Sequence, residues 1–267
     1  SRRLALEEQM NDALNRGEFS VLFQPKVEMV SGNIMGAEAL LRWHNPELGN
    51  ITPDEFIPIA EQSGLIVPIG EFVLVESLRF TSYIQKRLMH DFRIAVNISP
   101  RQFREPLLVK NIKKYIMQSD IAFDDLELEI TEGLLMNGHT TTYDALLEVV
   151  ELGIKIAMDD FGTGYSSLSY LRQYPFHVLK IDRSFINDIS TSSADRELIT
   201  ASITMAHGLK LKVVAEGIET EEQLAFLKGL SCDYAQGYLF GKPLTENDFY
   251  QLLESNRLAL KRPISRL

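Results

Sequence analysis

Polar residues interrupt or follow the short apolar segments of this chain, at positions where a plain core strand would be apolar. They are Glu38, Asn97, Glu129, Asp159 with Asp160, Lys180 with Asp182, Glu216 and Gln236. Burying many carboxylates together is costly unless cations compensate their charge. Carboxylate and amide oxygens are hard donors that suit Mg²⁺ or Mn²⁺. If these side chains meet in one cleft, the sequence predicts a divalent-metal site.

Asp159 and Asp160 are adjacent, so one carboxylate could bridge two ions while its neighbour binds the second ion. Metal pairs about 3.5–4 Å apart activate water and stabilise the leaving oxygen in phosphodiester cleavage. The histidines are scattered and show no HExxH spacing, so a zinc site is not expected. The residue types therefore favour phosphoester hydrolysis with Mg²⁺ or Mn²⁺.

Short apolar segments predict the strands that must position these residues. They are Ser20–Gln24, Ile34–Leu41, Arg93–Ile98, Leu126–Thr131, Ile154–Met158, Val178–Ile181, Leu211–Ala215 and Tyr234–Tyr238. Amphipathic segments between them predict helices at Phe72–Leu88, Leu108–Met117, Tyr143–Leu152, Arg196–His207 and Glu221–Leu227. This alternation is typical of a parallel sheet covered by helices, and the number of strands favours a closed (β/α)8 barrel of the α/β class. An open doubly wound sheet is the alternative, but no GxGxxG turn follows an early strand.

The barrel hypothesis explains how polar residues far apart in the sequence could form one site. The C-terminal ends of barrel strands converge on one face. Taken alone, each residue has an ordinary structural explanation, such as a helix cap for Asp159 or a turn residue before Pro100 for Asn97. Together they favour an active site, because a cluster of buried carboxylates requires compensating cations.

Composition limits the class of protein further. The chain has 267 residues and a formal net charge of −10, which argues against a general nucleic-acid binder, so no DNA partner is expected. We expect one domain over residues 1–267, because a chain of this length can bury a single barrel-sized core. No apolar stretch approaches the roughly 18 residues of a membrane helix, and the single Cys232 fits a cytoplasmic location.

The first residues predict an amphipathic helix from Arg2 to Arg16. We interpret residues 1–18 as a helix or linker that joins this domain to an upstream part of a larger multidomain protein. A segment outside this sequence could anchor the full-length protein to a membrane.

A series of longer motifs contains most of these polar residues. In order, they are Phe23-Gln24-Pro25, Glu38-Ala39-Leu40-Leu41-Arg42-Trp43, Asn97-Ile98-Ser99-Pro100, Glu129-Ile130-Thr131-Glu132, Asp159 through Gly164, Leu179-Lys180-Ile181-Asp182, Ala215-Glu216-Gly217-Ile218-Glu219 and Gln236-Gly237-Tyr238. This ordered set resembles the EAL-domain family of bacterial cyclic di-GMP phosphodiesterases and covers roughly residues 3 to 255. An ordered set of motifs is far more specific than one tripeptide.

The resemblance implies a TIM-like barrel with an antiparallel first strand, and hydrolysis of cyclic di-GMP to linear 5′-pGpG with two Mg²⁺ or Mn²⁺ ions. The implied ligands are Glu38, Asn97, Glu129 and Asp159 for the first ion, and Asp159, Asp160 and Glu216 for the second. Lys180 would fix the attacking water. Glu216 has a rival role as general base, which we rank second because a hydroxide between two cations needs less help from a base.

The resemblance also implies residues that bind the nucleotide. Arg42 would contact a phosphate oxygen, for which a planar guanidinium is suited. The other implied contacts to cyclic di-GMP are Gln24, Leu41, Asp182, Glu219 and Gln236. Lys26 stands at a position where the family usually has an apolar residue.

A loop and a neighbouring helix form the dimer contact in relatives, so a homodimer is expected. The loop and dimer residues are Glu132, Phe161, Gly162, Thr163 and Gly164. The Arg-rich start resembles the joint that often follows a diguanylate-cyclase domain, so we expect an upstream sensory or diguanylate-cyclase-like domain.

Two other functions fit the same residues. A cyclic di-GMP receptor would keep the ligand-binding residues but hydrolyse the nucleotide negligibly. A barrel metallohydrolase could act on another phosphodiester, because this architecture supports many chemistries. The completeness of the implied metal-ligand set favours the cyclic di-GMP phosphodiesterase.

Overall fold

The computed structural model of the chain describes residues 2–88, 91–136, 140–162 and 168–261. The strands are β1 (Phe19–Glu28), β2 (Ile34–Asn45), β3 (Gly49–Ile51), β4 (Arg93–Asn97), β5 (Leu126–Thr131), β6 (Lys155–Phe161), β7 (Val178–Ile181), β8 (Lys212–Ala215) and β9 (Tyr234–Gln236). The sheet order is β1-β9-β8-β7-β6-β5-β4-β2-β3, and an additional β1–β2 pairing closes the sheet into a barrel. Strand β3 extends this sheet only as an antiparallel partner of β2.

Strand β1 is antiparallel to both of its neighbours in the barrel, β2 and β9. The other neighbouring strands around the barrel, from β2 and β4 to β8 and β9, are parallel. The structure therefore confirms a TIM-like α/β barrel with an antiparallel first strand. The open sheet that competed with it is wrong, because β1 and β2 pair.

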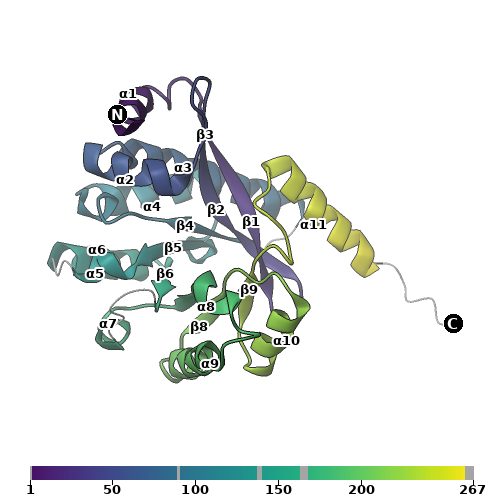
Figure 1. Cartoon of the computed structure of the whole chain (residues 1–267). Coiled ribbons are helices and arrows are strands. Elements are labelled where there is room, and N and C mark those ends of the chain that lie inside the picture. The colour runs from purple at the N-terminus through teal and green to yellow at the C-terminus, as the bar shows by residue number, and fades with distance from the viewer. Residues whose placement is uncertain (1, 89–90, 137–139, 163–167, 262–267) are drawn as a thin grey trace.

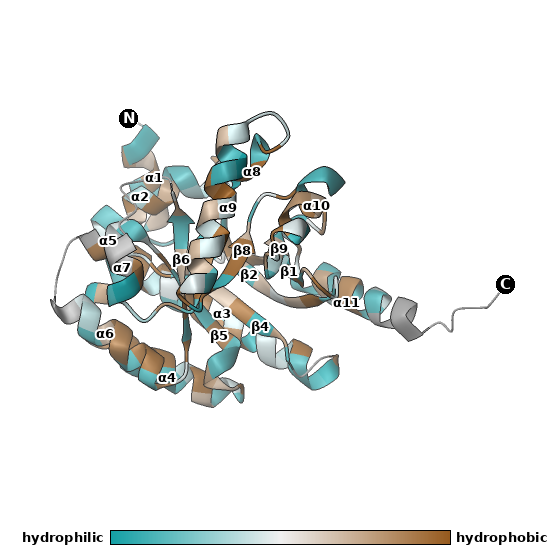
Figure 2. Cartoon of the chain, turned by 90° about the horizontal axis from the view of Figure 1, so that it is seen from below, coloured by the Kyte–Doolittle hydropathy of each residue, from teal (hydrophilic) through white to brown (hydrophobic). Residues whose placement is uncertain are grey.

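Helices surround the strands (Figure 1). They are α1 (Arg2–Met10), α2 (Pro53–Ser63), α3 (Ile66–Arg87), α4 (Leu108–Ser119), α5 (Glu132–Met136), α6 (Thr140–Glu151), α7 (Leu168–Gln173), α8 (Arg183–Asn187), α9 (Ser193–Gly208), α10 (Glu221–Gly229) and α11 (Glu246–Lys261). Helices such as α4, α6 and α9 carry both apolar and polar residues along their surfaces (Figure 2), as expected for helices that cover a barrel. No helix in the described part of the chain has the length and apolar character needed to span a membrane.

Stacked aromatic rings hold α3 and α11 against the barrel. Phe23 of β1 stacks on Phe80 of α3 with 3.8 Å between ring centroids, and Phe249 of α11 meets Phe80 edge-on at 5.5 Å. All three side chains are buried, and each contributes about 1.5–3 kcal/mol by its burial. A second core, which includes Leu6, Trp43 and Phe56, joins α1 and α2 to β2.

Two of the differences between the fold and the sequence expectations concern helices near the N-terminus. Helix α1 ends at Met10 and not at Arg16, because turn-forming residues such as Asn11 and Asp12 follow, and the Asn15 side chain bonds that of Asp12. Helix α2 lies in a segment for which the apolar pattern predicts no element. It begins with Pro53 at its first position and ends before Gly64, which has the left-handed φ of 82° favoured at a helix C-terminus.

Candidate active site

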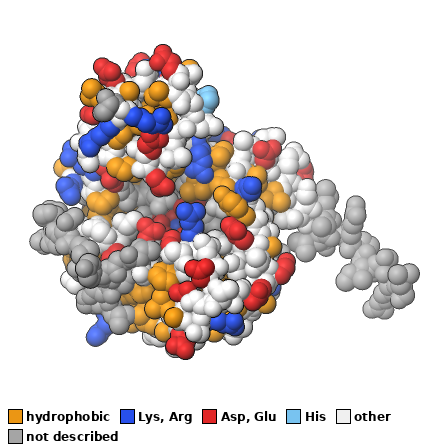
Figure 3. Space-filling model, viewed as in Figure 1, with side chains coloured by type: hydrophobic (Ala, Val, Ile, Leu, Met, Phe, Trp, Pro, Cys, Tyr) orange, Lys and Arg blue, Asp and Glu red, His pale blue; other side chains and the backbone are white. Residues whose placement is uncertain are grey.

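The polar residues predicted from the sequence meet at the C-terminal ends of the barrel strands. Asn97 is the last residue of β4, Asp159 lies near the end of β6, and Glu216 directly follows β8. Glu38 of the longer β2 pairs with Ala95 of β4, which brings it to the same level of the barrel. Acidic and basic side chains surround a hollow near the middle of one face of the molecule (Figure 3).

Lys180 of β7 lies at the centre of the carboxylates. Its Nζ is 2.7 Å from Glu129 Oε2, 2.7 Å from Glu216 Oε1, 3.2 Å from Asp159 Oδ1 and 3.7 Å from Glu38 Oε2. The Lys180 side chain is only 1% exposed, so bulk water screens these attractions weakly. One ammonium group therefore organises four carboxylates from four different parts of the chain.

Amide side chains fix Glu38 from two sides. Asn97 Nδ2 donates to Glu38 Oε1 at 2.8 Å, and Gln236 Nε2 donates to Glu38 Oε2 at 2.6 Å. The same Gln236 nitrogen donates to Gln24 Oε1 at 3.0 Å, and Gln24 Nε2 donates to the carbonyl of Gly241 at 3.2 Å. This network joins β1, β2, β4 and β9 and explains why four of the predicted polar residues lie together.

Two lysines hold Glu129. Lys180 binds its Oε2 at 2.7 Å, and Lys26 Nζ from β1 lies 2.8 Å from its Oε1. Lys26 also binds Glu127 Oε1 at 2.8 Å. Sequence reasoning registered Lys26 only as a departure from the family pattern. Its role was missed because Lys26 and Glu129 come from different strands, which meet only in the closed barrel.

The cluster perturbs the protonation of its members. Burial raises the pKa of Glu38 to about 7, to which the neighbouring charge of Glu129 adds, and burial raises the pKa of Glu216 to about 8. Burial acts the same way on Glu129, but Lys180 and Lys26 outweigh it and lower its pKa well below the usual range. Burial opposes the charge of Lys180, yet the four carboxylates raise its pKa well above its ordinary value.

When ionised, the four carboxylates of the cluster carry more negative charge than the ammonium groups of Lys180 and Lys26 neutralise. The donor atoms are carboxylate and amide oxygens, which suit Mg²⁺ or Mn²⁺, and an added divalent cation would offset the surplus charge. Within the described residues, no group of three or more His, Cys, Asp or Glu side chains has the geometry to hold a metal ion, and Lys180 lies between the carboxylates. The donor set fits the predicted metals in charge and chemistry.

A cavity of about 280 Å³ opens above the cluster. The predicted residues that line it are Gln24, Glu38, Arg42, Asp159, Lys180, Glu216, Glu219 and Gln236. Its lining also includes Arg183, which sequence reasoning missed although it directly follows the motif that ends in Asp182. The cavity thus has two guanidinium groups near a floor of carboxylates, an arrangement that can bind a phosphate ester when cations accompany it.

Other predicted residues lie around the cavity without lining it. Asn97 and Glu129 are in the network beneath, while Asp182 caps α8 by accepting a hydrogen bond from the Ser184 amide at 2.9 Å. Leu41 packs against both hydrophobic cores, and its neighbour Leu40 lines the cavity.

The segment that carries Glu219 has a well-defined local structure. Thr220 Oγ1 accepts a hydrogen bond from the Gln223 amide at 3.2 Å, and Gln223 Oε1 accepts one from the Thr220 amide at 3.0 Å. This reciprocal capping fixes the start of α10. Because Gln223 Oε1 also accepts from the Glu219 amide at 2.7 Å, the cap holds Glu219 at the edge of the cavity.

The predicted loop begins within the described residues and continues beyond them. Asp160 has a φ of 55°, and its amide donates to Asp159 Oδ1 at 2.9 Å. Glu132 is buried at the start of α5, and Phe161 ends β6. The predicted loop residues Thr163 and Gly164 lie outside the described residues.

The structure combines a barrel whose first strand is antiparallel with a carboxylate cluster at the C-terminal ends of its strands. Residues 7–243 match the EAL domain, and this chain belongs to that family. It is 42% identical over 247 residues to the bifunctional diguanylate cyclase/cyclic di-GMP phosphodiesterase MucR of Pseudomonas aeruginosa, covering 91% of this chain and 35% of MucR. It is 39% identical over 267 residues to the cyclic di-GMP phosphodiesterase NbdA of the same organism, covering 100% of this chain and 34% of NbdA.

Solved structures give the same family. The PaMucR phosphodiesterase in complex with c-di-GMP has a TM-score of 0.87 at 40% identity, covering 92% of this chain and 99% of that chain. The EAL enzyme Bd1971 in its cAMP and cyclic-di-GMP bound form has a TM-score of 0.91 at 37% identity, covering 94% of this chain and 69% of that chain. The present chain spans about a third of the length of the curated relatives it matches, and those relatives are multidomain proteins.

Proposed function

We propose that this domain is a metal-dependent phosphodiesterase that hydrolyses cyclic di-GMP to linear 5′-pGpG and so lowers the level of this second messenger in bacterial signalling. The observation that carries the proposal is the meeting of Glu38, Glu129, Asp159 and Glu216 around Lys180, within 3.7 Å of its Nζ. Such a cluster is costly for a domain that only folds, because it leaves buried negative charge uncompensated.

Two divalent cations, Mg²⁺ or Mn²⁺, fit the oxygen donors of the cluster. Glu38, Asn97, Glu129 and Asp159 would hold the first ion, and Asp159, Asp160 and Glu216 would hold or orient the second. When bound, such ions lower the pKa of water and stabilise the attacking and leaving oxygens of phosphodiester hydrolysis. The hydrogen bonds that the side-chain amides of Asn97 and Gln236 donate to Glu38 keep its carboxylate in position for this role.

Lys180 is proposed to orient the attacking water through a hydrogen bond from Nζ. An ammonium group has three N–H donors, and carboxylates surround the Lys180 Nζ in the present structure. One N–H group would therefore exchange a carboxylate for the water. Glu216 supports the second ion, or serves as general base in its rival role.

The two arginines of the cavity are proposed to bind the phosphates of cyclic di-GMP. Arg42 Nη1 donates to the Leu41 carbonyl at 2.9 Å, which fixes the guanidinium and leaves other N–H groups for a ligand. Arg183 supplies a second guanidinium at the same cavity, matching the two phosphates of the nucleotide. Gln24, Glu219 and Gln236 would contact the rest of the ligand, while contacts from Leu41 and Asp182 stay predictions.

The relatives support the substrate. MucR and NbdA are named cyclic di-GMP phosphodiesterases, and the PaMucR structure contains c-di-GMP. Because these relatives extend well beyond the matched region, an upstream sensory or diguanylate-cyclase-like domain stays part of the proposal. The same holds for a cytoplasmic location and for a homodimer formed through the region of Glu132, Phe161 and Gly162.

Incubation of the protein with cyclic di-GMP tests this function directly. Mg²⁺ or Mn²⁺ would be added in separate reactions, EDTA would serve as the control, and anion-exchange chromatography would resolve the products. Metal-dependent formation of 5′-pGpG is the expected result. Binding of intact cyclic di-GMP without turnover would favour the receptor function, and failure to bind it would favour another phosphodiester.

A further inference from the structure

A second cavity, of about 280 Å³, lies at the opposite end of the barrel from the carboxylate cluster. Its lining includes the first residues of several strands, among them Arg93 of β4, Lys155 of β6, Lys212 of β8 and Tyr234 of β9. The N-terminal strand ends of a barrel lie on the face away from the usual active site. This cavity is therefore separate from the site proposed for cyclic di-GMP.

Positive charge dominates the lining of this cavity. The cationic side chains are Lys26, Arg93, Lys155, Lys210 and Lys212, and the carboxylates are Asp124 and Glu127. The whole chain has a net charge of −10, so the cavity reverses the charge of the molecule locally. A concave site lined by one sign of charge concentrates ligands of the opposite sign.

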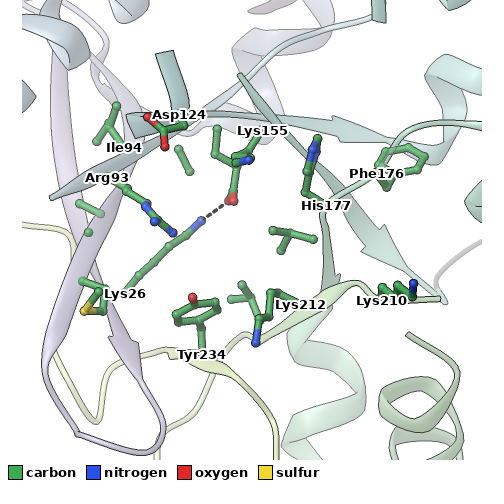
Figure 4. A pocket seen from close by; sticks show the side chains of 17 residues that line it. Lys26, Arg93, Ile94, Asp124, Lys155, Phe176, His177, Lys210, Lys212 and Tyr234 are labelled. Atoms are coloured by element: carbon green, nitrogen blue, oxygen red, sulfur yellow. Dashed lines mark hydrogen bonds and ion pairs between the residues drawn. The ribbon is translucent and has the colours of Figure 1, made fainter. Parts of the chain in front are cut away.

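Three of these cations are available to a ligand. Lys26 binds Glu127 and Glu129, and Lys212 binds Asp233 at 2.7 Å. By contrast, the side chains of Arg93, Lys155 and Lys210 form no hydrogen bond or ion pair with other residues in the described part of the chain. Arg93 points toward the middle of the cavity (Figure 4).

Neutral hydrogen-bond donors complete the lining. His177 Nδ1 accepts a hydrogen bond from the Ile156 amide at 3.2 Å, which leaves Nε2 as the protonated nitrogen of the neutral ring. Burial and the nearby Lys155 lower the pKa of His177, which favours this neutral form. The Tyr234 hydroxyl points into the cavity from β9 (Figure 4).

The cavity also has apolar walls, to which Met35, Phe176 and Val178 contribute. Its volume of about 280 Å³ is just below the range of about 300–1,000 Å³ for ligand pockets. The dimensions and chemistry therefore suit a compact molecule that has an anionic group and an apolar or ring-shaped body.

We propose that this cavity is a second binding site, which takes a small phosphorylated molecule. Arg93 and Lys155 bind the phosphate by charge-assisted hydrogen bonds, and His177 and Tyr234 add neutral donors. The body of the ligand packs against the wall formed by Phe176 and Val178. The site does not depend on the proposed phosphodiesterase activity, since it shares no lining residue with the carboxylate cavity.

Isothermal titration calorimetry with inorganic pyrophosphate tests the site. The buffer contains EDTA and has constant ionic strength, so that metal pyrophosphate complexes and general screening do not contribute. We expect saturable binding by the wild type, and at least about tenfold weaker binding by the Arg93→Ala/Lys155→Ala variant, since hydrogen bonds to charged groups are strong. Arg42→Ala, in the other cavity, should bind pyrophosphate as the wild type does.

A matched variant controls for the loss of two positive charges. Lys110→Ala/Lys113→Ala removes two exposed lysines from α4, and neither lines the cavity. It should bind pyrophosphate like the wild type, and thermal unfolding should show that both double variants are folded. The proposal is wrong if the wild type shows no saturable binding, if the α4 variant loses affinity equally, or if only Arg42→Ala loses affinity.

Discussion

Lys26 Nζ lies 2.8 Å from Oε1 of Glu129 inside the barrel, although the two residues are far apart in the sequence. The Lys26 side chain is 11% exposed and the Glu129 side chain is fully buried, so the pair forms in a region of low dielectric. Lys26 thereby fixes one oxygen of a proposed metal ligand, while Lys180 binds the other. Breaking this pair should leave a buried carboxylate partly compensated.

Lys26→Met should therefore lower the free energy of unfolding by about 1–3 kcal/mol, because Glu129 loses a charged partner but keeps Lys180. Urea denaturation measures the change, and the exposed Lys113→Met on α4 is the control. A double-mutant cycle with Glu129→Gln should give a coupling energy of at least about 0.5 kcal/mol. Strictly additive effects would contradict the proposed pairing.

The stability of the metal-free protein should fall as pH rises from about 5 to about 8. The folded-state pKa values of Glu38 and Glu216 are raised to about 7 and about 8, so the folded state keeps protons that the unfolded state has lost. Their stabilising contribution is thus complete at low pH and is lost as pH rises through these values. Urea denaturation in EDTA at several pH values measures the slope.

A double variant identifies the groups responsible for this pH dependence. Glu38→Gln/Glu216→Gln removes both titrating carboxylates, so its free energy of unfolding should depend much less on pH between 5 and 8. Glu129 has a lowered pKa and stays ionised across this range in the folded state. An unchanged slope in the double variant would show that other groups titrate.

Mg²⁺ or Mn²⁺ should raise the unfolding temperature, because a ligand that binds only the folded state stabilises it by about 2.7 kcal/mol at a hundredfold excess over its Kd. Thermal unfolding with and without EDTA measures the shift. The Asp159→Asn variant should lose most of it, whereas Glu151→Gln, at an exposed site on α6, should keep it. Equal shifts in both variants would place the ions outside the cluster.

Gly162 lies in the described part of the loop, at a position that does not tolerate a Cβ atom. Its φ is 97°, and a Cβ there would lie 2.8 Å from the Phe185 ring. Gly162→Ala should cost about 1–3 kcal/mol through backbone strain and this clash. Gly208→Ala is the control, since a Cβ at Gly208 meets no atom within 4 Å. Urea denaturation compares them, and equal stabilities would contradict the described loop geometry.

The sequence predicted the barrel because its central strands are short apolar runs that end in polar residues. The bounds of β5 and β7 agree with the prediction, since both are buried parallel strands. Strands β1 and β2 are longer than predicted, because their mutual antiparallel pairing continues through polar residues such as Lys26. The spacing of apolar residues does not predict where backbone hydrogen bonds between two strands continue through polar residues.

The carboxylates of the candidate site were predicted together with Lys180 and Arg42, whereas the roles of Lys26 and Arg183 were missed. Glu38, Asp159 and Glu216 stood out because charged residues are unusual at the ends of apolar strands. The Lys26 contact to Glu129 and the placement of Arg183 at the cavity depend on tertiary structure, which single-sequence patterns do not contain. The cationic cavity at the other end of the barrel was missed for the same reason, because its residues come from separate strand starts.

The turnover of cyclic di-GMP by Asp159→Asn and Glu38→Ala tests the central claim most directly. Initial rates of 5′-pGpG formation would be compared with the wild type at saturating Mn²⁺, after thermal unfolding has shown that the variants are folded. Because metal ions supply several kcal/mol of transition-state stabilisation, both variants should lose more than about a hundredfold in rate. Rates like those of the wild type in either variant would contradict the assignment of the carboxylate cluster as the catalytic centre.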